Sequence, residues 1–283
     1  MIDMPLNMKN QSYQAYVHLL KQTLAFMLWP EPLVPVDAKD YKTHGKVKLT
    51  FFRLLESLAK LGNIQLSKRS FHTQLERIEG RVWRNYPHTM IGLHRLDNIQ
   101  ECTEAVLRDG VPGDFIETGA WRGGACIFMR GLLTAAHVSD RKVYVADSFE
   151  GLPEPDESTY PSDKGDTHHL YDFLAVDIDT VKQNFADYGL LDDQVVFLKG
   201  WFKDTLPAAP IDKLAILRLD GDMYSSTMEA LEILYPKLSP GGFCIVDDYH
   251  LSGCQQAIDD YRKSHSITQP LQAIDWAGRF WRK

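Results

Sequence analysis

The chain has 283 residues, of which 44% are hydrophobic and 24% charged, and its net charge is −7. This size fits one α/β domain that carries an extension. No apolar run approaches the length of a membrane span, and an acidic balance without a basic stripe argues against nucleic acid as a partner. The start lacks the layout of a signal peptide, and the four cysteines lack metal-like spacing, so we expect buried thiols in a cytoplasmic protein.

The first third of the chain has helical periodicity. The first of its helices has one apolar face, which we expect to pack against the body or against a second subunit. The proline-rich segment WPEPLVP ends this helix, and Gly110 and Pro112 end the last one. The predicted helices are 11–28, 46–61, 68–84 and 95–108, and the apolar face of the first comprises Tyr13, Tyr16, Val17, Leu20, Leu24, Met27 and Leu28.

From residue 113 the pattern changes to alternating strands and helices. This alternation predicts a doubly wound, mostly parallel sheet with an antiparallel end. We interpret the chain as an α/β fold with a helical extension at 1–85, which serves as a lid or for dimerisation, and a main domain at 86–283. The predicted strands are GDFIET, KVYVADS, QVVFLKG, LAILRLD, GFCIVDD and a final pair around PLQAIDW and GRFWRK, and the helices are 124–136, 177–188, 225–238 and 254–264.

A long loop follows the second of these strands, from Gly151 to about Asp172. It is rich in prolines and acids, and it contains His168 and His169. A loop of this length in a compact domain is typical of a lid or a binding loop, and a disordered surface loop has the same composition. We favour a lid, because the loop leaves the sheet beside the acids described next.

Paired acids follow two neighbouring strands: Asp220 and Asp222 come after LAILRL, and Asp247 and Asp248 come after GGFCIV. The carboxyl ends of parallel strands open on one edge of a sheet, so these side chains can converge. Convergent carboxylates repel one another unless a cation or a proton lies between them. Oxygen ligands suit a hard divalent ion such as Mg²⁺. A metal site is therefore the first interpretation, and separate solvated acids are the alternative.

A glycine-rich turn follows the first strand. Its spacing is not GxGxxG, which disfavours a dinucleotide, and its leading acid suits a cationic amine better than phosphates. The second strand ends in Asp147 and Ser148, where such sheets present a carboxylate to ribose hydroxyls, and the third ends in Gly200, Trp201 and Phe202, an apolar wall for a purine. Each motif alone fits a tight turn, a helix cap or core packing, but together they indicate a nucleoside with an ammonium group. The turn comprises Glu117, Thr118, Gly119, Ala120, Trp121, Arg122, Gly123 and Gly124.

These segments, in this order, resemble the macrocin O-methyltransferase family, the S-adenosylmethionine-dependent sugar methyltransferases of macrolide and aminocoumarin biosynthesis. The resemblance runs from about Tyr86 to the C-terminus. It implies a class I methyltransferase fold, S-adenosylmethionine and Mg²⁺ as cofactors, a sugar-containing small-molecule acceptor and a homodimer or higher homo-oligomer. The segments that carry it are PHTMIGLHRLDNI, FIETGAWRGGACIFMRG, VYVADSFEGLPEPD, VVFLKGWFKDTLP, LRLDGDMYSSTMEALEILYPKLSPGGFCIVDDY and the closing ID and FWRK.

The resemblance also implies a role for each site residue. Glu117 would bind the amine of the cofactor, within the turn that includes Thr118, Gly119, Ala120 and Trp121; Asp147 and Ser148 would bind its ribose; Gly200, Trp201 and Phe202 would contact its adenine; and Thr89 and Met90 would close over it. Asp220, Asp247 and Asp248 would be the magnesium ligands, and Asp222 the general base.

A sugar hydroxyl is a weak acid near neutral pH, so its methylation needs a group that lowers its pKa and a base that takes its proton. A metal at the three aspartates would serve as template and Lewis acid, and Asp222 would remove the proton. His168 is the second candidate, as base or as hydroxyl orienter, and its alternative is an exposed loop histidine. Two other classes stay open: a metal-dependent glycosyltransferase that uses Asp220 and Asp222, which the acid of the first turn disfavours, and a non-catalytic binding protein, which the presence of all four acids disfavours.

Overall fold

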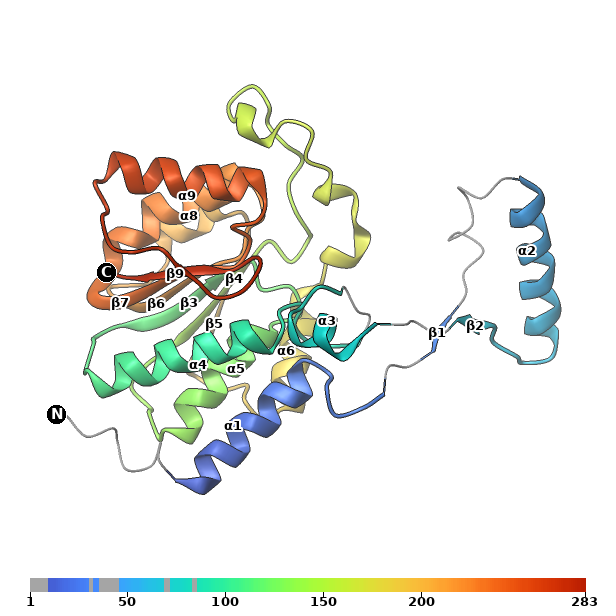
Figure 1. The fold of residues 1–283 in the computed structure, drawn as a ribbon, viewed down its shortest axis with the longest axis horizontal. Helices are drawn as coiled ribbons and strands as arrows, with labels where there is room; N and C mark the ends of the chain where they lie inside the picture. The colour runs from blue at the N-terminus through green and yellow to red at the C-terminus, as the bar shows by residue number, and fades with distance from the viewer. Residues whose placement is uncertain (1–9, 31–32, 36–45, 69–71, 83–85) are drawn as a thin grey trace.

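The computed structural model describes all residues except 1–9, 31–32, 36–45, 69–71 and 83–85. Its centre is a seven-stranded sheet in the order β5-β4-β3-β6-β7-β9-β8, in which the first five strands are parallel and β9 is antiparallel to its neighbours. Helices cover both faces (Figure 1), so the predicted doubly wound sheet with an antiparallel end is confirmed. The strands are β3 (Asp114–Thr118), β4 (Val143–Asp147), β5 (Val195–Lys199), β6 (Leu214–Leu219), β7 (Leu238–Val246), β8 (Gln272–Ala273) and β9 (Arg279–Arg282).

The core lies in two layers, one on each face of the sheet, because successive side chains of a strand alternate between the faces. Phe115 and Val145 belong to the layer that α1, α4, α5 and α6 cover, whereas Ile116 and Tyr144 belong to the layer that α8 and α9 cover. The helices are α1 (Gln11–Leu24), α4 (Leu93–Arg108), α5 (Gly124–Ala135), α6 (Ile178–Asp187), α8 (Tyr224–Leu234) and α9 (Ser252–Ser264). All four cysteines are buried free thiols, as predicted.

The first helix packs against the body of the molecule. Val17 and Leu20 of α1 are buried, and Leu20 lies so close to Gly131 of α5 that a side chain at residue 131 would collide with it. α1 ends at Leu24 rather than at the predicted residue 28, so Leu28 is 47% exposed and does not extend the buried face. The N-terminal helix is thus part of the same core as the sheet.

The helix predicted over 68–84 is wrong for the part of it that the structure describes. β2 (Ser67–Lys68) pairs with β1 (Val34–Pro35), and only α3 (Gln74–Ile78) is helical. Thr73 fixes the start of α3, because its hydroxyl oxygen accepts the backbone N–H of Glu76 at 3.1 Å while the Glu76 carboxylate accepts that of Thr73. The apolar periodicity of this segment therefore covers more residues than the helix itself, which begins only after its N-cap at Thr73.

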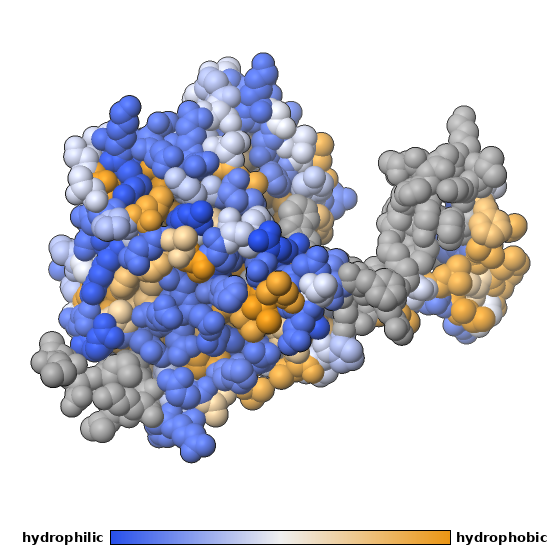
Figure 2. Space-filling model, viewed as in Figure 1, coloured by the Kyte–Doolittle hydropathy of each residue, from blue (hydrophilic) through white to orange (hydrophobic). Residues whose placement is uncertain are grey.

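The helix predicted over 46–61 is confirmed as α2 (Lys46–Leu61), which stands apart from the rest of the chain (Figure 1). Leu54, Leu58 and Leu61 are 59%, 56% and 85% exposed, and Figure 2 shows hydrophobic residues gathered on this helix. The N-terminal extension thus divides into α1, which is integrated in the core, and α2, which stands away from it. A domain boundary at residue 85 and a role in dimerisation or as a lid stay predictions.

The loop after β4 is folded, with 3₁₀ turns at Pro161–Asp163, His168–Leu170 and Asp172–Leu174. Asp163 is only 3% exposed, and its two carboxylate oxygens accept the backbone N–H groups of Tyr224 at 2.6 Å and Ser225 at 3.0 Å. The loop thereby caps the start of α8, whose own flanking residue supplies no side-chain cap. Among the described helices, none is both long and apolar enough to cross a membrane.

Candidate active site

The order of the strands reverses between β3 and β6, and ligands of open α/β sheets bind at such a point, outside the carboxyl ends of the strands. Gly119 follows β3 here with a φ of +90°. A side chain at this position would collide with the carbonyl oxygen of Asp220, which follows β6. The two strand ends can approach this closely only because residue 119 is a glycine.

A pocket opens at this point, between the strand ends and the loop after β4. Gly119, Asp220 and Asp222 all line it, so it joins the glycine turn to the first pair of acids. The loop contributes Gly151, Leu152, Pro153, Glu154, Asp156, Tyr160 and Leu174. The predicted cofactor residues in its wall are Met90, Gly119, Trp121, Asp147, Ser148, Gly200, Trp201 and Phe202, whereas Thr89, Glu117, Thr118 and Ala120 are buried and do not line it.

Asp147 holds the glycine turn in place. Its Oδ2 accepts the backbone N–H groups of Ala120 at 2.7 Å and Trp121 at 3.1 Å, and its Oδ1 accepts that of Phe149 at 2.7 Å. Burial raises the pKa of this carboxyl, and the three N–H groups act in the opposite direction. The indole Nε1 of Trp121 then donates to the carbonyl of Phe173 at 2.8 Å, which joins the turn to the loop.

Glu117, the predicted ligand of the cofactor amine, is buried and does not line the pocket. It is 1% exposed, forms an ion pair with Arg218 and accepts the thiol of Cys126 at 2.9 Å. Burial raises the pKa of Glu117 to about 7; the guanidinium of Arg218 opposes this shift and the charge of Asp220 adds to it. The structure brings Glu117 close to the acid cluster, a proximity that the sequence did not predict.

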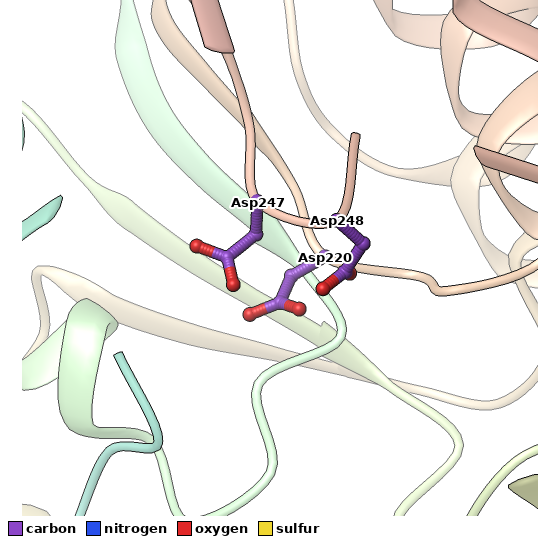
Figure 3. Close-up of side chains that lie close together, drawn as sticks. All are labelled: Asp220, Asp247 and Asp248. Carbon is purple, nitrogen blue, oxygen red and sulfur yellow. The ribbon is translucent and has the colours of Figure 1, made fainter. Parts of the chain in front are cut away.

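The predicted metal ligands converge. One carboxylate oxygen each of Asp220, Asp247 and Asp248 lies within 4.8 Å of the others, and Figure 3 shows the three side chains gathered at neighbouring strand ends. Oδ2 of Asp248 is buried and has no hydrogen-bond partner within the described ranges. A buried acceptor without a donor is unfavourable, and three carboxylates suit a hard divalent cation. The residues present therefore fit a metal site.

Two arginines partly neutralise this cluster. Arg218 donates to Asp220 Oδ2 at 2.7 Å and to Asp247, and Arg95 donates to the other oxygen of Asp247 and to Asp275 at 3.0 Å. Neither arginine was predicted as a site residue. A signal was present for Arg218, because a charged residue inside the apolar strand LAILRL must find partners; Asp163 and Arg95 carry no such signal.

Asp222, the predicted general base, lies partly buried in the pocket wall with a φ of +57°. Burial, followed by the charge of Asp220, raises its pKa to about 7, and His168 acts in the opposite direction. His168 lies in the loop with its Nδ1 2.8 Å from Asp166 Oδ2, and it does not line the pocket. The structure thus places Asp222 at the pocket and His168 near it.

A sheet of this order, with a glycine turn and a pocket at the point of reversal, defines a class I methyltransferase fold. The chain belongs to the macrocin-O-methyltransferase (TylF) family, which it matches over residues 13–283. The match begins well before Tyr86, where the resemblance of the sequence motifs starts, and it includes α2 and all but the first two residues of α1.

The chain is similar to several O-methyltransferases. It is 55% identical over 207 residues to the 8-demethyl-8-(2,3-dimethoxy-alpha-L-rhamnosyl)-tetracenomycin-C 4′-O-methyltransferase of Streptomyces olivaceus, a match that covers 73% of this chain and 79% of the relative. It is 52% identical over 210 residues to the mycinamicin III 3″-O-methyltransferase of Micromonospora griseorubida, covering 73% and 83%. The solved structure of the O-methyltransferase NovP superposes with a TM-score of 0.81 at 43% identity, covering 96% of this chain and 99% of NovP.

The chain is therefore an S-adenosylmethionine-dependent O-methyltransferase, and both its fold and its family are as the sequence predicted. This finding supports the methyltransferase interpretation over the glycosyltransferase and the non-catalytic binding protein. The cytoplasmic location, the homodimer and the exclusion of nucleic acid stay predictions.

Proposed function

We propose that the chain methylates a hydroxyl group of a sugar, in particular a deoxysugar of a natural-product glycoside. The observation that carries this proposal is that one pocket is lined both by the glycine turn at Gly119 and by the acids Asp220 and Asp222. A methyl donor held on the first side and a hydroxyl held on the second would meet there. The name of the tetracenomycin relative gives a rhamnosyl-bearing acceptor methylated at position 4′, which supports a sugar.

For the cofactor, we propose that Trp201 and Phe202 form the wall for the adenine, and that Asp147 and Ser148 face the ribose. The Asp147 oxygens already accept three backbone N–H groups, which leaves one acceptor site of the carboxylate for a ribose hydroxyl. Glu117, behind the glycine turn, would attract the amine. Met90, Gly119, Trp121 and Gly200 of the pocket wall would complete the cofactor site, and their buried chain neighbours Thr89, Thr118 and Ala120 would support them.

For the acceptor, we propose that Asp220, Asp247 and Asp248 hold Mg²⁺. Bound there, the ion would orient two adjacent sugar hydroxyls and lower the pKa of one of them. The unpartnered Oδ2 of Asp248 and the convergence of the three carboxylates support this assignment. Asp222 lies in the same pocket wall as Asp220 and would accept the proton of the hydroxyl.

His168 is proposed as a residue that orients the sugar. Its Nδ1 is 2.8 Å from Asp166 Oδ2, which fixes the ring, so Nε2 is the nitrogen that it would offer to a hydroxyl. Because His168 does not line the pocket, this role requires the loop to move over the acceptor.

The test is to incubate the protein with labelled S-adenosylmethionine, Mg²⁺ and a panel of deoxysugar glycosides and their free aglycones, with and without a chelator. We expect label on the sugar of at least one glycoside and loss of transfer with the chelator. Transfer to aglycones alone would overturn the sugar assignment. Turnover that the chelator leaves unchanged would overturn the metal assignment.

A further inference from the structure

Arg218 is a fully buried charge in the middle of the sheet. It lies in β6 between β3 and β7, in register with Glu117 and Ile245, and its side chain is 1% exposed. A buried guanidinium is unfavourable unless carboxylates surround it. The carboxylates that Arg218 contacts are therefore the groups whose negative charge it neutralises.

Those groups belong to both sides of the site. Nη1 donates to Glu117 and, at 2.7 Å, to Asp220 Oδ2, and Nη2 donates to Asp247 Oδ1. Glu117 is the residue proposed to attract the cofactor amine, whereas Asp220 and Asp247 are proposed metal ligands. One guanidinium thus divides its charge between a carboxylate of the cofactor side and two carboxylates of the metal side.

The other arginine of the cluster differs in this respect. Arg95 of α4 pairs with Asp247 and Asp275 and forms no ion pair with Glu117. Arg95 is also buried, at 5% exposure, and it touches the same metal ligand. It is therefore a matched control for the effect of removing an arginine from the cluster.

We propose that Arg218 is a positioning residue that couples the occupancy of the metal site to the binding of the cofactor's amino group. The proposal rests on the functions proposed above for Glu117 and for the three aspartates. A divalent cation at Asp220, Asp247 and Asp248 takes up carboxylate charge that Arg218 otherwise neutralises. Arg218 then pairs more fully with Glu117, and less negative charge remains for an ammonium group.

The charge of the cation itself acts in the same direction, because it repels the ammonium group. Both effects predict that Mg²⁺ weakens the binding of a cofactor that has a free amine. Couplings between ligand sites are typically fivefold or more in affinity, and linkage makes them reciprocal. The cofactor would therefore weaken the binding of the ion by the same factor.

The first test uses the unmodified protein and isothermal titration calorimetry. S-adenosylhomocysteine has the amino acid part of the cofactor, and 5′-methylthioadenosine lacks it. We expect saturating Mg²⁺ to raise the Kd of S-adenosylhomocysteine about fivefold or more, and to change the Kd of 5′-methylthioadenosine less than about twofold. A Kd of S-adenosylhomocysteine that is equal or lower with Mg²⁺ overturns the coupling and leaves the proposed function standing.

Two further outcomes separate the coupling from the proposed function. Absence of S-adenosylhomocysteine binding overturns the cofactor site itself, and absence of Mg²⁺ binding in a direct titration overturns the metal site. The coupling falls with either of them.

The second test uses Arg218→Lys, which keeps the charge but replaces the planar fork that donates to Glu117, Asp220 and Asp247 with a compact ammonium. We expect the Mg²⁺ effect on the Kd of S-adenosylhomocysteine to be smaller in R218K than in the unmodified protein, because only the direct repulsion between the ion and the ammonium group remains, and to keep its full size in Arg95→Lys. If Arg218 had a merely structural role, both variants would bind S-adenosylhomocysteine more weakly. The ratio of its Kd with Mg²⁺ to its Kd without Mg²⁺ would then be the same as in the unmodified protein. If R218K does not fold, a Kd of S-adenosylhomocysteine in the unmodified protein that is equal or lower with Mg²⁺ still overturns the proposal.

Discussion

The two halves of the site bury their carboxylates in different ways. In the glycine-turn half, Asp147 accepts three backbone N–H groups, which the turn and the strand end supply. In the carboxylate half, Asp220 and Asp247 pair with arginine side chains, and Asp248 keeps a buried oxygen without a partner within the described ranges. The fold itself fixes backbone donors, whereas side-chain pairs can yield to a cation.

This difference indicates that the glycine-turn half is a preformed binding surface. In the carboxylate half, a bound cation can change which carboxylates pair with the arginines. Each half should therefore respond to its own substitutions. Changes among the acids should alter the rate and the affinity for the ion, whereas changes around Asp147 should alter the affinity for the cofactor.

The largest effect is expected for Asp222→Asn. Asparagine tolerates the φ of +57° at this position, so the backbone should be unchanged, but an amide cannot take the proton of the hydroxyl. We expect kcat to fall about 10²- to 10⁴-fold, while the Kd of S-adenosylhomocysteine changes less than about twofold. Steady-state kinetics and calorimetry measure the two quantities, with the exposed Asp193→Asn as control. Activity comparable to that of the control would remove Asp222 from the mechanism.

The next effect concerns Asp248→Asn in the carboxylate half. The variant loses one proposed ligand, so the Kd of Mg²⁺ should rise by about 10- to 100-fold. Metal affinity falls by this factor even when only a hydrogen-bond partner of a metal ligand is removed. It also removes a carboxyl whose pKa burial raises well above the ordinary value, so the ion-free protein should be no less stable than the parent. Titration calorimetry and thermal unfolding with chelator measure the two changes. A destabilised ion-free variant with unchanged Mg²⁺ affinity would make Asp248 a structural residue.

The sequence predicted the glycine turn and the acids because those signals are local: Gly119, Asp220 and Asp247 each directly follow a strand. The position of Arg218 inside an apolar strand is a signal that it has partners, but the sequence does not show which, because Arg218 meets Glu117 across 101 residues and Arg95 meets Asp247 across 152. The prediction of a helix over 68–84 was wrong because the sequence pattern did not show where the helix begins. Apolar periodicity shows which residues can be buried on a helix, but the cap at Thr73 decides where the helix begins.

A smaller effect is expected for Asp147→Ala in the glycine-turn half. The variant leaves the N–H groups of Ala120, Trp121 and Phe149 without their acceptor, and each lost partner of this kind costs about 1–3 kcal/mol. We expect a lower melting temperature and a Kd of S-adenosylhomocysteine raised by about tenfold, a loss of 1.4 kcal/mol. The Kd of Mg²⁺ should change less than about twofold. Asp147→Asn, which keeps one acceptor oxygen, should be intermediate. An equal loss of Mg²⁺ affinity would show that the halves are not separate.

The smallest effect is expected at the loop that joins the halves. Asp163 caps α8 through the N–H groups of Tyr224 and Ser225, directly after the segment that presents Asp222. Loss of such a cap lowers the free energy of unfolding by about 0.5–2 kcal/mol, so Asp163→Ala should lower the melting temperature by a few degrees. The exposed Asp172→Ala in the same loop is the control and should stay within about 0.5 kcal/mol of the parent. Because the cap fixes the segment of Asp222, kcat should fall more than the affinity for S-adenosylhomocysteine; a loss confined to cofactor affinity would instead assign Asp163 to the glycine-turn half.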